Sequence, residues 1–314
     1  MGYSTQLTEP SQRQLLLLGA SSFVGNCLFQ KIGVDCAVGT FFRNSRTELE
    51  YFDSVRMDVN DLIGIDDNFG HAVILLGDSD PDSCVNDVAK SNALNVVSII
   101  EIIDVLIDKD ITPVFISSQF VFDGLKGAYN EEDPVNPILV YGKQKVAVEQ
   151  YLREQTKNHL ILRLPKVYGT SPGDGTLFTS WVDNIRSGMR QITCAEDQIF
   201  SPIVVDDVAD AILATIEAGC IGTYHVSGPE SYTRIEMLMI LLSKLDRIGN
   251  FDIQLEPCSI NDFDLPERRP IDVSMISEKL VRELGLQLKP LNESCDQIIS
   301  NYFPSRAEKK RIIQ

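Results

Sequence analysis

The chain has 314 residues, which is enough to bury a large core and exceeds one typical domain. Its formal net charge of −17 argues against a nucleic-acid binder, because phosphate contacts need a basic surface. No apolar run approaches the ~18 to 20 residues that span a bilayer, and residues 1–10 lack a basic segment followed by an apolar one. We therefore expect a cytoplasmic protein with neither a nucleic-acid nor a membrane partner.

The cysteines and histidines give no sign of a metal site. The seven cysteines include no Cys-x-x-Cys pair, which fits reduced thiols better than a disulfide framework. The three histidines, His71, His159 and His225, also lack the spacing of metal ligands. We expect no metal.

The first half of the chain alternates strands with helices. Residues 14–18 form an apolar strand that runs into a glycine-containing turn and then a helix through Ile32. Further strands are predicted at 37–42, 54–59, 72–76, 112–117 and 159–164, and helices at 85–107 and 141–155. This alternation predicts an α/β fold with a Rossmann-type, doubly wound parallel sheet covered by helices on both faces.

The pattern changes after Tyr168. A Gly/Pro loop leads to a predicted helix at 177–187, an extended stretch at 199–205, a helix at 206–218 and a strand at 222–226. Thr233 and Glu236 form a capping box that opens an apolar helix to Leu245. The remainder mixes a short strand, a turn-rich segment and two short helices, which predicts a smaller C-terminal α/β lobe.

The turn after the first strand has the layout of a phosphate cradle. Gly19 and Gly25 fill the outer positions of the dinucleotide fingerprint, but Ser22 stands where a middle glycine is usual. Its hydroxyl could donate to a phosphate instead. The motif alone does not separate a cofactor cradle from a turn between core elements. The candidate cofactor-binding residues of this turn are Gly19, Ser21, Ser22, Phe23, Val24 and Gly25.

The segment after the second strand bears on which dinucleotide binds. NAD-selective folds place a carboxylate about 20 positions after the glycine turn, whereas this segment carries Arg43 and Arg46. Guanidinium groups suit the 2′-phosphate of NADP, although two surface arginines are the alternative. Asp58 follows the third predicted strand and is placed to meet the adenine edge, but a surface carboxylate there is as common. We predict NADP(H) as the cofactor, ahead of NAD(H).

Residues 12–168 would then be the NADP-binding Rossmann domain, completed by about 204–226. The smaller lobe, from 169–203 and 227–303, would bind the substrate. Residues 304–314 would form a solvated tail.

Three polar residues suit hydride chemistry at a carbonyl. Ser118 follows the fifth predicted strand, and Tyr141 and Lys145 are four residues apart, so they share a face of the next helix. A phenol can protonate the carbonyl oxygen, but its unperturbed pKa is about 10. Lys145 would lower that pKa and also bond the nicotinamide ribose, while Ser118 would bond the substrate oxygen. The pair could occur by chance in a chain with nine tyrosines, but its place in the strand and helix series favours the catalytic interpretation.

These motifs together resemble the extended short-chain dehydrogenase/reductase superfamily. Within it, the chain is similar to the dTDP-4-dehydrorhamnose reductase branch, which also includes the regulatory β subunit of methionine adenosyltransferase. The resemblance is carried, in family order, by residues 19–25, 117–124, 129–133, 141–145, 162–169, 204–209 and 268–270.

The resemblance implies roles for particular residues. Ser118, Tyr141 and Lys145 would be the catalytic trio, with Tyr141 and Lys145 also contacting the cofactor. Leu164 and Val167 would line the nicotinamide end. A nucleotide-sugar would lie in the C-terminal lobe, with Gln119, Phe120 and Arg269 as substrate contacts. A homodimer is the oligomeric state that the superfamily suggests.

The chain departs from this family at two places. Gln119 and Phe120 stand where the rhamnose-type reductases have Asp and Tyr, and Gln-Phe cannot perform the acid/base step of the related dehydratases. The loop after the fourth strand is acidic at Asp78 and Asp80, where the family usually has Asn-Ala-Ala. Because carboxylates would repel a pyrophosphate, we expect both to face solvent.

Three functions remain open. The first is an NADP(H)-dependent reductase acting on a keto group of a nucleotide-activated sugar by a Ser-Tyr-Lys mechanism. The second is a cofactor-binding regulatory subunit that turns over slowly or not at all. The third is a nucleotide-sugar epimerase, which usually holds NAD tightly, so that Arg43 and Arg46 speak against it.

Overall fold

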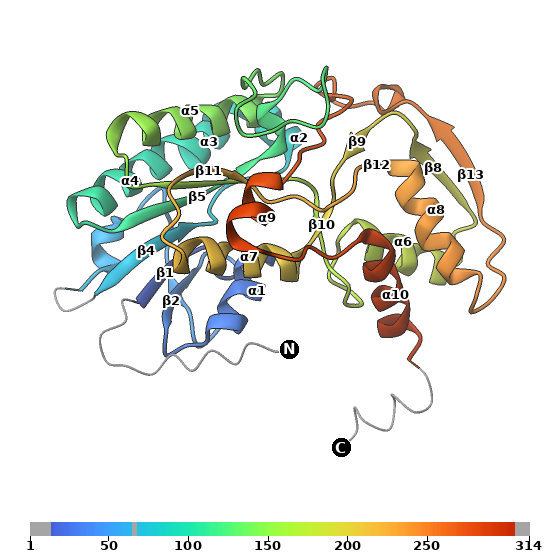
Figure 1. Ribbon diagram of the computed structural model, residues 1–314, viewed down its shortest axis with the longest axis horizontal. Coiled ribbons are helices and arrows are strands. Elements are labelled where there is room, and N and C mark those ends of the chain that lie inside the picture. The colour runs from blue at the N-terminus through green and yellow to red at the C-terminus, as the bar shows by residue number, and fades with distance from the viewer. Residues whose placement is uncertain (1–13, 65–67, 305–314) are drawn as a thin grey trace.

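A computed structural model describes residues 14–64 and 68–304. Its centre is a parallel sheet of seven strands in the order β11-β6-β5-β4-β1-β2-β3, as predicted from the alternation of strands and helices (Figure 1). Residues 12–13 of the expected first domain and 305–314 of the expected tail lie outside the described residues. The strands of the sheet are β1 (Gln14–Leu18), β2 (Ala37–Phe41), β3 (Glu50–Tyr51), β4 (Phe69–Ile74), β5 (Thr112–Ser118), β6 (Leu160–Leu164) and β11 (Gly222–His225).

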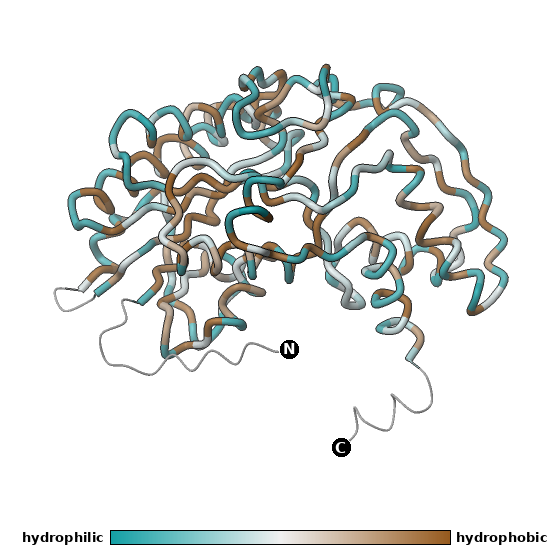
Figure 2. Tube along the Cα trace, in the orientation of Figure 1, coloured by the Kyte–Doolittle hydropathy of each residue, from teal (hydrophilic) through white to brown (hydrophobic). Residues whose placement is uncertain are grey.

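Helices cover both faces of the sheet, which explains its apolar strands (Figures 1 and 2). On one face lie α1 (Phe23–Ile32), α7 (Val205–Glu217) and α9 (Glu278–Leu284), and on the other α4 (Ser98–Asp108) and α5 (Val140–Gln155). Successive side chains of β1 point to opposite faces of the sheet. Leu17 packs on the face covered by α1, α7 and α9, and Leu16 and Leu18 pack on the face covered by α4 and α5. Burial on both faces is typical of a parallel sheet.

Two predicted elements are wrong. Residues 54–59 are not a strand, because the Asp53 carboxylate accepts the N–H of Val55 at 3.1 Å and the Asp53 carbonyl accepts that of Met57 at 2.8 Å, which closes a turn. The helix predicted at 85–107 is interrupted at Asp87, whose side chain caps a new helix start. The segment instead consists of α2 (Pro81–Asn86), α3 (Val88–Asn92), a π-helical turn (Ala93–Val97) and α4.

The smaller lobe has its own core and small sheets beside the large one. Its helices are α6 (Leu177–Arg186), α8 (Arg234–Leu245) and α10 (Leu291–Tyr302), which enclose buried side chains such as Phe178, Leu238 and Ile298. The capping box of Thr233 and Glu236 begins α8 as predicted. The strands outside the seven-stranded sheet are β7 (Val167–Tyr168), β8 (Gln191–Ala195), β9 (Ile199–Phe200), β10 (Ile203–Val204), β12 (Tyr232–Thr233) and β13 (Gln254–Cys258).

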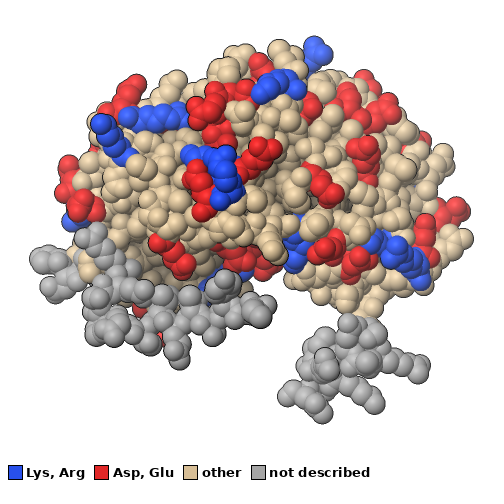
Figure 3. All heavy atoms as spheres, viewed as in Figure 1, with Lys and Arg blue, Asp and Glu red and all other residues tan. Residues whose placement is uncertain are grey.

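The surface and the thiols agree with the composition. The face seen in Figure 3 carries acidic side chains over both lobes, with basic side chains among them. All seven cysteines are free thiols. Within residues 14–64 and 68–304, no helix has the length and apolar character needed to cross a membrane. In the same part of the chain, no group of three or more histidine, cysteine or carboxylate side chains could hold a metal ion.

Candidate active site

A cleft of about 630 Å³ opens at the carboxyl ends of the sheet strands. Its walls are the segments that follow β1, β4, β5 and β6, together with residues of the smaller lobe. In doubly wound sheets, ligands bind at the carboxyl edge where the strand order reverses, which is between β1 and β4 here. The cleft therefore lies where this fold binds a dinucleotide.

The turn between β1 and α1 has the shape of a phosphate cradle. Gly19 has a φ of 93°, and its N–H donates to the Thr40 hydroxyl at 2.8 Å. A Cβ on Gly25 would lie 2.3 Å from the Gly19 carbonyl oxygen, so glycine is required for α1 to begin this close to β1. The Ser22 hydroxyl accepts the N–H of Gly25 at 3.1 Å and caps the helix. Ser22, Phe23 and Val24 line the cleft, whereas Gly19, Ser21 and Gly25 shape the turn behind them.

The two predicted 2′-phosphate residues lie beside this cradle. Arg46 donates to the side chain of Asn26 in α1, and the Arg43 guanidinium lies 5.7 Å from the centre of the Phe42 ring. Both arginines are exposed, and both follow β2, next to the glycine turn. Asp58 is also exposed, but its carboxylate accepts the N–H of Asn60 at 2.8 Å and caps a 3₁₀ helix. Contact with the 2′-phosphate or the adenine stays a prediction for all three.

Ser118, Tyr141 and Lys145 all line the cleft. Ser118 ends β5, and the other two lie one turn apart near the start of α5. The Lys145 Nζ donates to the Ile116 carbonyl at 2.9 Å and lies 5.6 Å from the centre of the Tyr141 ring. The three side chains thus converge on one point of the cleft, at the junction of β5 and α5.

The protonation of Tyr141 and Lys145 is set mainly by burial. Burial raises the pKa of Tyr141 well above its ordinary value, and the Ser118 hydroxyl opposes this rise. Burial lowers the pKa of Lys145 to about 8, although the negative charge of Glu149 acts to raise it. At neutral pH the phenol therefore keeps its proton while Lys145 remains largely cationic. This is the state that a proton donor needs.

Glu149 lies one turn beyond Lys145 and is fully buried. It accepts hydrogen bonds from Ser117 at 2.5 Å and from Arg163 at 2.7 and 3.0 Å. Burial alone would raise the pKa of Glu149, but the bonds and charge of Arg163 hold it below its usual value. Arg163 in turn lies 3.4 Å from His225 Nε2, and burial together with that guanidinium lowers the pKa of His225 to about 3. The network fixes α5 against β5, β6 and β11.

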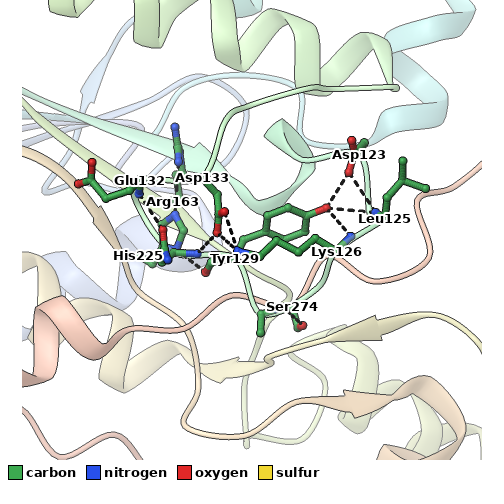
Figure 4. Close-up of polar contacts among 11 residues, drawn as sticks. Asp123, Leu125, Lys126, Tyr129, Glu132, Asp133, Arg163, His225 and Ser274 are labelled. Atoms are coloured by element: carbon green, nitrogen blue, oxygen red, sulfur yellow. Dashed lines mark hydrogen bonds and ion pairs between the residues drawn. The ribbon is translucent and has the colours of Figure 1, made fainter.

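Tyr129 orders the loop between β5 and α5 (Figure 4). Its hydroxyl donates to Asp123 at 2.6 Å and accepts the backbone N–H groups of Leu125 and Lys126, each at 3.1 Å. Its ring stacks on Phe122, with the ring centroids 4.1 Å apart. The acidic motif at 129–133 therefore holds the loop that leads into α5.

The three predicted substrate residues surround the trio. Gln119 is only 4% exposed, and its Oε1 has no hydrogen-bond partner. The Phe120 ring meets the Tyr141 ring edge-on, with the centroids 6.3 Å apart. Arg269 forms an ion pair with Asp82 in α2. This ion pair joins the smaller lobe to the Rossmann side of the cleft. Leu164 and Val167, predicted at the nicotinamide end, also line the cleft.

The acidic loop after β4 is a wall of the same cleft. Asp80 is exposed as expected, and its carboxylate caps α2 by accepting the N–H of Asp82 at 3.1 Å. The expectation that Asp78 faces solvent is wrong. Asp78 is half-buried, because its carboxylate accepts the Ser83 hydroxyl and the N–H of Asp80. Both carboxylates therefore have hydrogen-bond donors within the loop.

Four residues of the site have no motif that marks them. Asn95, in the π-helical turn, accepts the N–H of Asp78 at 2.7 Å and donates to the Asp78 carbonyl at 3.0 Å. Its only sequence signal is a polar residue within an apolar run. The other three come from distant segments that only the tertiary structure brings to the cleft or to the start of α5: Gln198, Arg234 and Glu267.

Known proteins of similar sequence or structure include dTDP-4-dehydrorhamnose reductases and a subunit of methionine adenosyltransferase 2. A dTDP-4-dehydrorhamnose reductase of Sinorhizobium fredii is 28% identical over 194 residues, which is 59% of this chain and 64% of that protein. Methionine adenosyltransferase 2 subunit beta of Bos taurus is 28% identical over 235 residues, 72% of this chain and 70% of that one. The crystal structure of a Bacillus anthracis dTDP-4-dehydrorhamnose reductase in complex with NADP has a TM-score of 0.76 at 20% identity, over 92% of this chain and 99% of that one.

The chain spans less than two thirds of the length of the first of these relatives. The match to a protein family, in contrast, covers nearly all of the described residues. The RmlD substrate binding domain matches residues 13–303, and the chain belongs to this family.

Proposed function

We propose that the protein is an NADP(H)-dependent reductase of a keto group on a nucleotide-activated sugar. One observation carries the proposal: Ser118, Tyr141 and Lys145 converge in a cleft at the carboxyl edge of the sheet, beside the glycine turn. The cradle fits a dinucleotide, since Ser22, Phe23 and Val24 at the N-terminus of α1 line the cleft, and the free N–H groups of a helix start favour a pyrophosphate. The name of the B. anthracis relative and its NADP complex agree with this cofactor.

Each residue of the trio has a distinct task. A reduced nicotinamide held beside Tyr141 and Lys145 would supply the hydride for the keto carbon. Tyr141 gives its proton to the keto oxygen, so that the product is an alcohol, and Lys145 stabilises the phenolate that is left. The Ser118 hydroxyl accepts the Phe120 N–H at 3.2 Å, which leaves its own proton to bond the substrate oxygen. Solvent then returns a proton to Tyr141.

The direct test is stoichiometric NADPH oxidation against a panel of nucleotide-linked keto sugars. Replacing Tyr141 by Phe should lower kcat by about 10²- to 10⁴-fold, the usual contribution of a general acid. NADPH should still bind, because the glycine turn is intact in this variant. Tyr151→Phe is the matched control, since Tyr151 lies on the same helix but its hydroxyl bonds Asp104. Turnover that survives in Tyr141→Phe contradicts the mechanism.

A regulatory subunit is the second candidate. Two observations favour it: Gln119 and Phe120 replace the family's Asp and Tyr, and one relative is named as a subunit of methionine adenosyltransferase 2. NADPH binding without turnover on the whole panel would support this reading. Interconversion of sugars without net NADPH oxidation would instead support an epimerase.

A further inference from the structure

A loop of the smaller lobe reaches across the cleft to the Rossmann side. It follows β13 and a 3₁₀ turn (Ile260–Asp262), and its residues 263–268 have no regular secondary structure. In Figure 1 this segment runs from the end of β13 toward the start of α5. Phe263 and Leu265 line the cleft, although Phe263 is 38% exposed. Apolar side chains that face a cleft and remain partly exposed gain burial when a ligand fills it.

The two ends of this loop are tied to each other and to both sides of the cleft. The Asn261 side chain accepts the N–H of Arg269 at 3.0 Å, which closes the neck of the loop. Asp197 holds the first end in the smaller lobe, because its carboxylate accepts the N–H of Ile260 at 2.8 Å. The ion pair of Arg269 with Asp82 holds the second end against α2. A loop whose ends are joined in this way can move as a unit about its neck.

Between these ends, Glu267 holds the loop against the start of α5. Its two carboxylate oxygens lie 3.0 and 3.3 Å from the backbone nitrogen of Val140, which donates to them. Val140 directly precedes Tyr141, so this latch closes the loop against the helix that carries the proposed proton donor. A segment with little burial opens more readily than the core does. Four of the six residues of the loop are exposed: Phe263, Asp264, Pro266 and Arg268.

We propose that residues 263–268 are a lid, which opens to admit a ligand to the catalytic end of the cleft and closes when Glu267 binds the start of α5. The closed lid places Phe263 and Leu265 over the bound ligand and keeps water away from Tyr141. The inference rests on the proposed function only for the identity of that ligand. Neither the opening of the lid nor its measurement depends on turnover.

Limited trypsin digestion of the full chain measures the opening of the lid. Arg268 is exposed, but a protease must draw several residues out of the closed loop to cut the bond after it. Val140→Pro removes the N–H that Glu267 accepts, and proline suits the first position of a helix after the extended Leu139. Relative to other tryptic bonds, this cleavage should become about tenfold faster, the value of one hydrogen bond to a charged group. Val140→Ala, which keeps the N–H, is the matched control.

Chemical labelling of Lys145 tests whether the loop covers the site. Lys145 lines the cleft, and trinitrobenzenesulfonate reacts with its uncharged amine. Labelling at about pH 9.5, above the Lys145 pKa of about 8, makes the rate report access instead of charge. Glu267→Ala, which breaks the latch from the loop side, should speed the labelling of Lys145 about tenfold. The rate at Lys157, which is exposed, should not change. Asp264→Ala, which removes an exposed carboxylate of the same loop, is the matched control.

Two outcomes would overturn the proposal. Cleavage after Arg268 that is as fast in the wild type as in Val140→Pro would show that nothing latches the loop. Faster cleavage without faster labelling of Lys145 would show a loose loop that leaves the cleft open. Glu267→Ala provides a second cleavage test, in which its rate is compared with that of the same variant unfolded in urea. A failure to oxidise NADPH on the sugar panel would contradict the proposed function and leave the lid unaffected.

Discussion

The Glu267 carboxylate, from the smaller lobe, accepts the backbone N–H of Val140 at 3.0 Å. Val140 is the first residue of α5, the helix that carries Tyr141 and Lys145, and Leu139 before it provides no side-chain cap. A helix N-terminus has a partial positive charge that favours nearby anions. Glu267 therefore satisfies the helix start and joins the smaller lobe to the helix that carries Tyr141 and Lys145.

Replacing Glu267 by Ala should remove both the acceptor for the Val140 N–H and the favourable negative charge at this helix start. Because loss of a capping acceptor typically costs about 0.5 to 2 kcal/mol, the free energy of unfolding should fall by that amount. Urea unfolding measures the loss. Glu154→Ala, which removes an exposed carboxylate at the far end of α5, should change the unfolding free energy by less than about 0.5 kcal/mol. Equal stability of the Glu267 variant and the wild type would contradict this role.

Arg43 and Arg46 should decide between the two dinucleotides. Replacing Arg46 by Ala should weaken NADPH binding by about 10- to 100-fold, the usual value of a hydrogen bond to a charged group, and Arg43→Ala should act in the same direction. NADH binding should change little, because it has no 2′-phosphate. Arg56→Ala, which alters another exposed arginine, serves as the control. Equal losses for NADPH and NADH would show that the arginines do not recognise the 2′-phosphate.

Glu149 should be the most sensitive residue of the buried network. Glu149→Gln leaves the Arg163 guanidinium buried without a counter-charge, which typically costs about 3 to 5 kcal/mol of unfolding free energy. Urea unfolding measures this loss. Arg153→Gln should cost less than about 1 kcal/mol, because Arg153 is the partly exposed partner of the same carboxylate. Replacing both Glu149 and Arg163 by Met should recover part of the stability, whereas similar losses for the Glu149 and Arg153 variants would argue against the network.

His225 should make the fold sensitive to acid. Its pKa is about 3 in the folded chain against an ordinary value of 6.5, so between these pH values the unfolded state binds a proton that the folded state does not. The stabilisation is complete above pH 6.5 and is lost as the pH falls, with a limiting slope of about 1.4 kcal/mol per pH unit. His225→Gln cannot titrate, so the unfolding free energy of this variant should fall less steeply below pH 6.5. Parallel pH curves for the variant and the wild type would contradict this.

The parts of the site that the sequence predicts are those with a local signal. Gly19, Gly25 and the Tyr141–Lys145 pair follow from spacing within one turn or one helix, and the structure places them in or beside the cleft. Arg234 and Glu267 have no such signal. Their places in the site are determined by how the smaller lobe packs on the Rossmann sheet, which residue order alone does not define.

One of the two errors in secondary structure has a related origin. The helix predicted at 85–107 has helical spacing throughout, yet it is interrupted because Asp87 caps a new start and Asn95 is engaged by the loop after β4. Apolar periodicity reports which face is buried, but it does not report where a side chain withdraws from the helix to bind another segment.

The tether between Asn95 and the loop after β4 holds this loop by its backbone, so the loop side chains that line the cleft take no part in it. Both backbone polar groups of Asp78 bind the Asn95 amide, and a Cβ at Gly77 would lie 2.8 Å from the Asn95 Oδ1. Ser79, which is exposed, follows on the same wall. A laboratory that wishes to alter ligand selectivity can therefore randomise Ser79 while Asn95 and Gly77 preserve the loop. The same tether makes Asn95 the position to leave untouched in any such library.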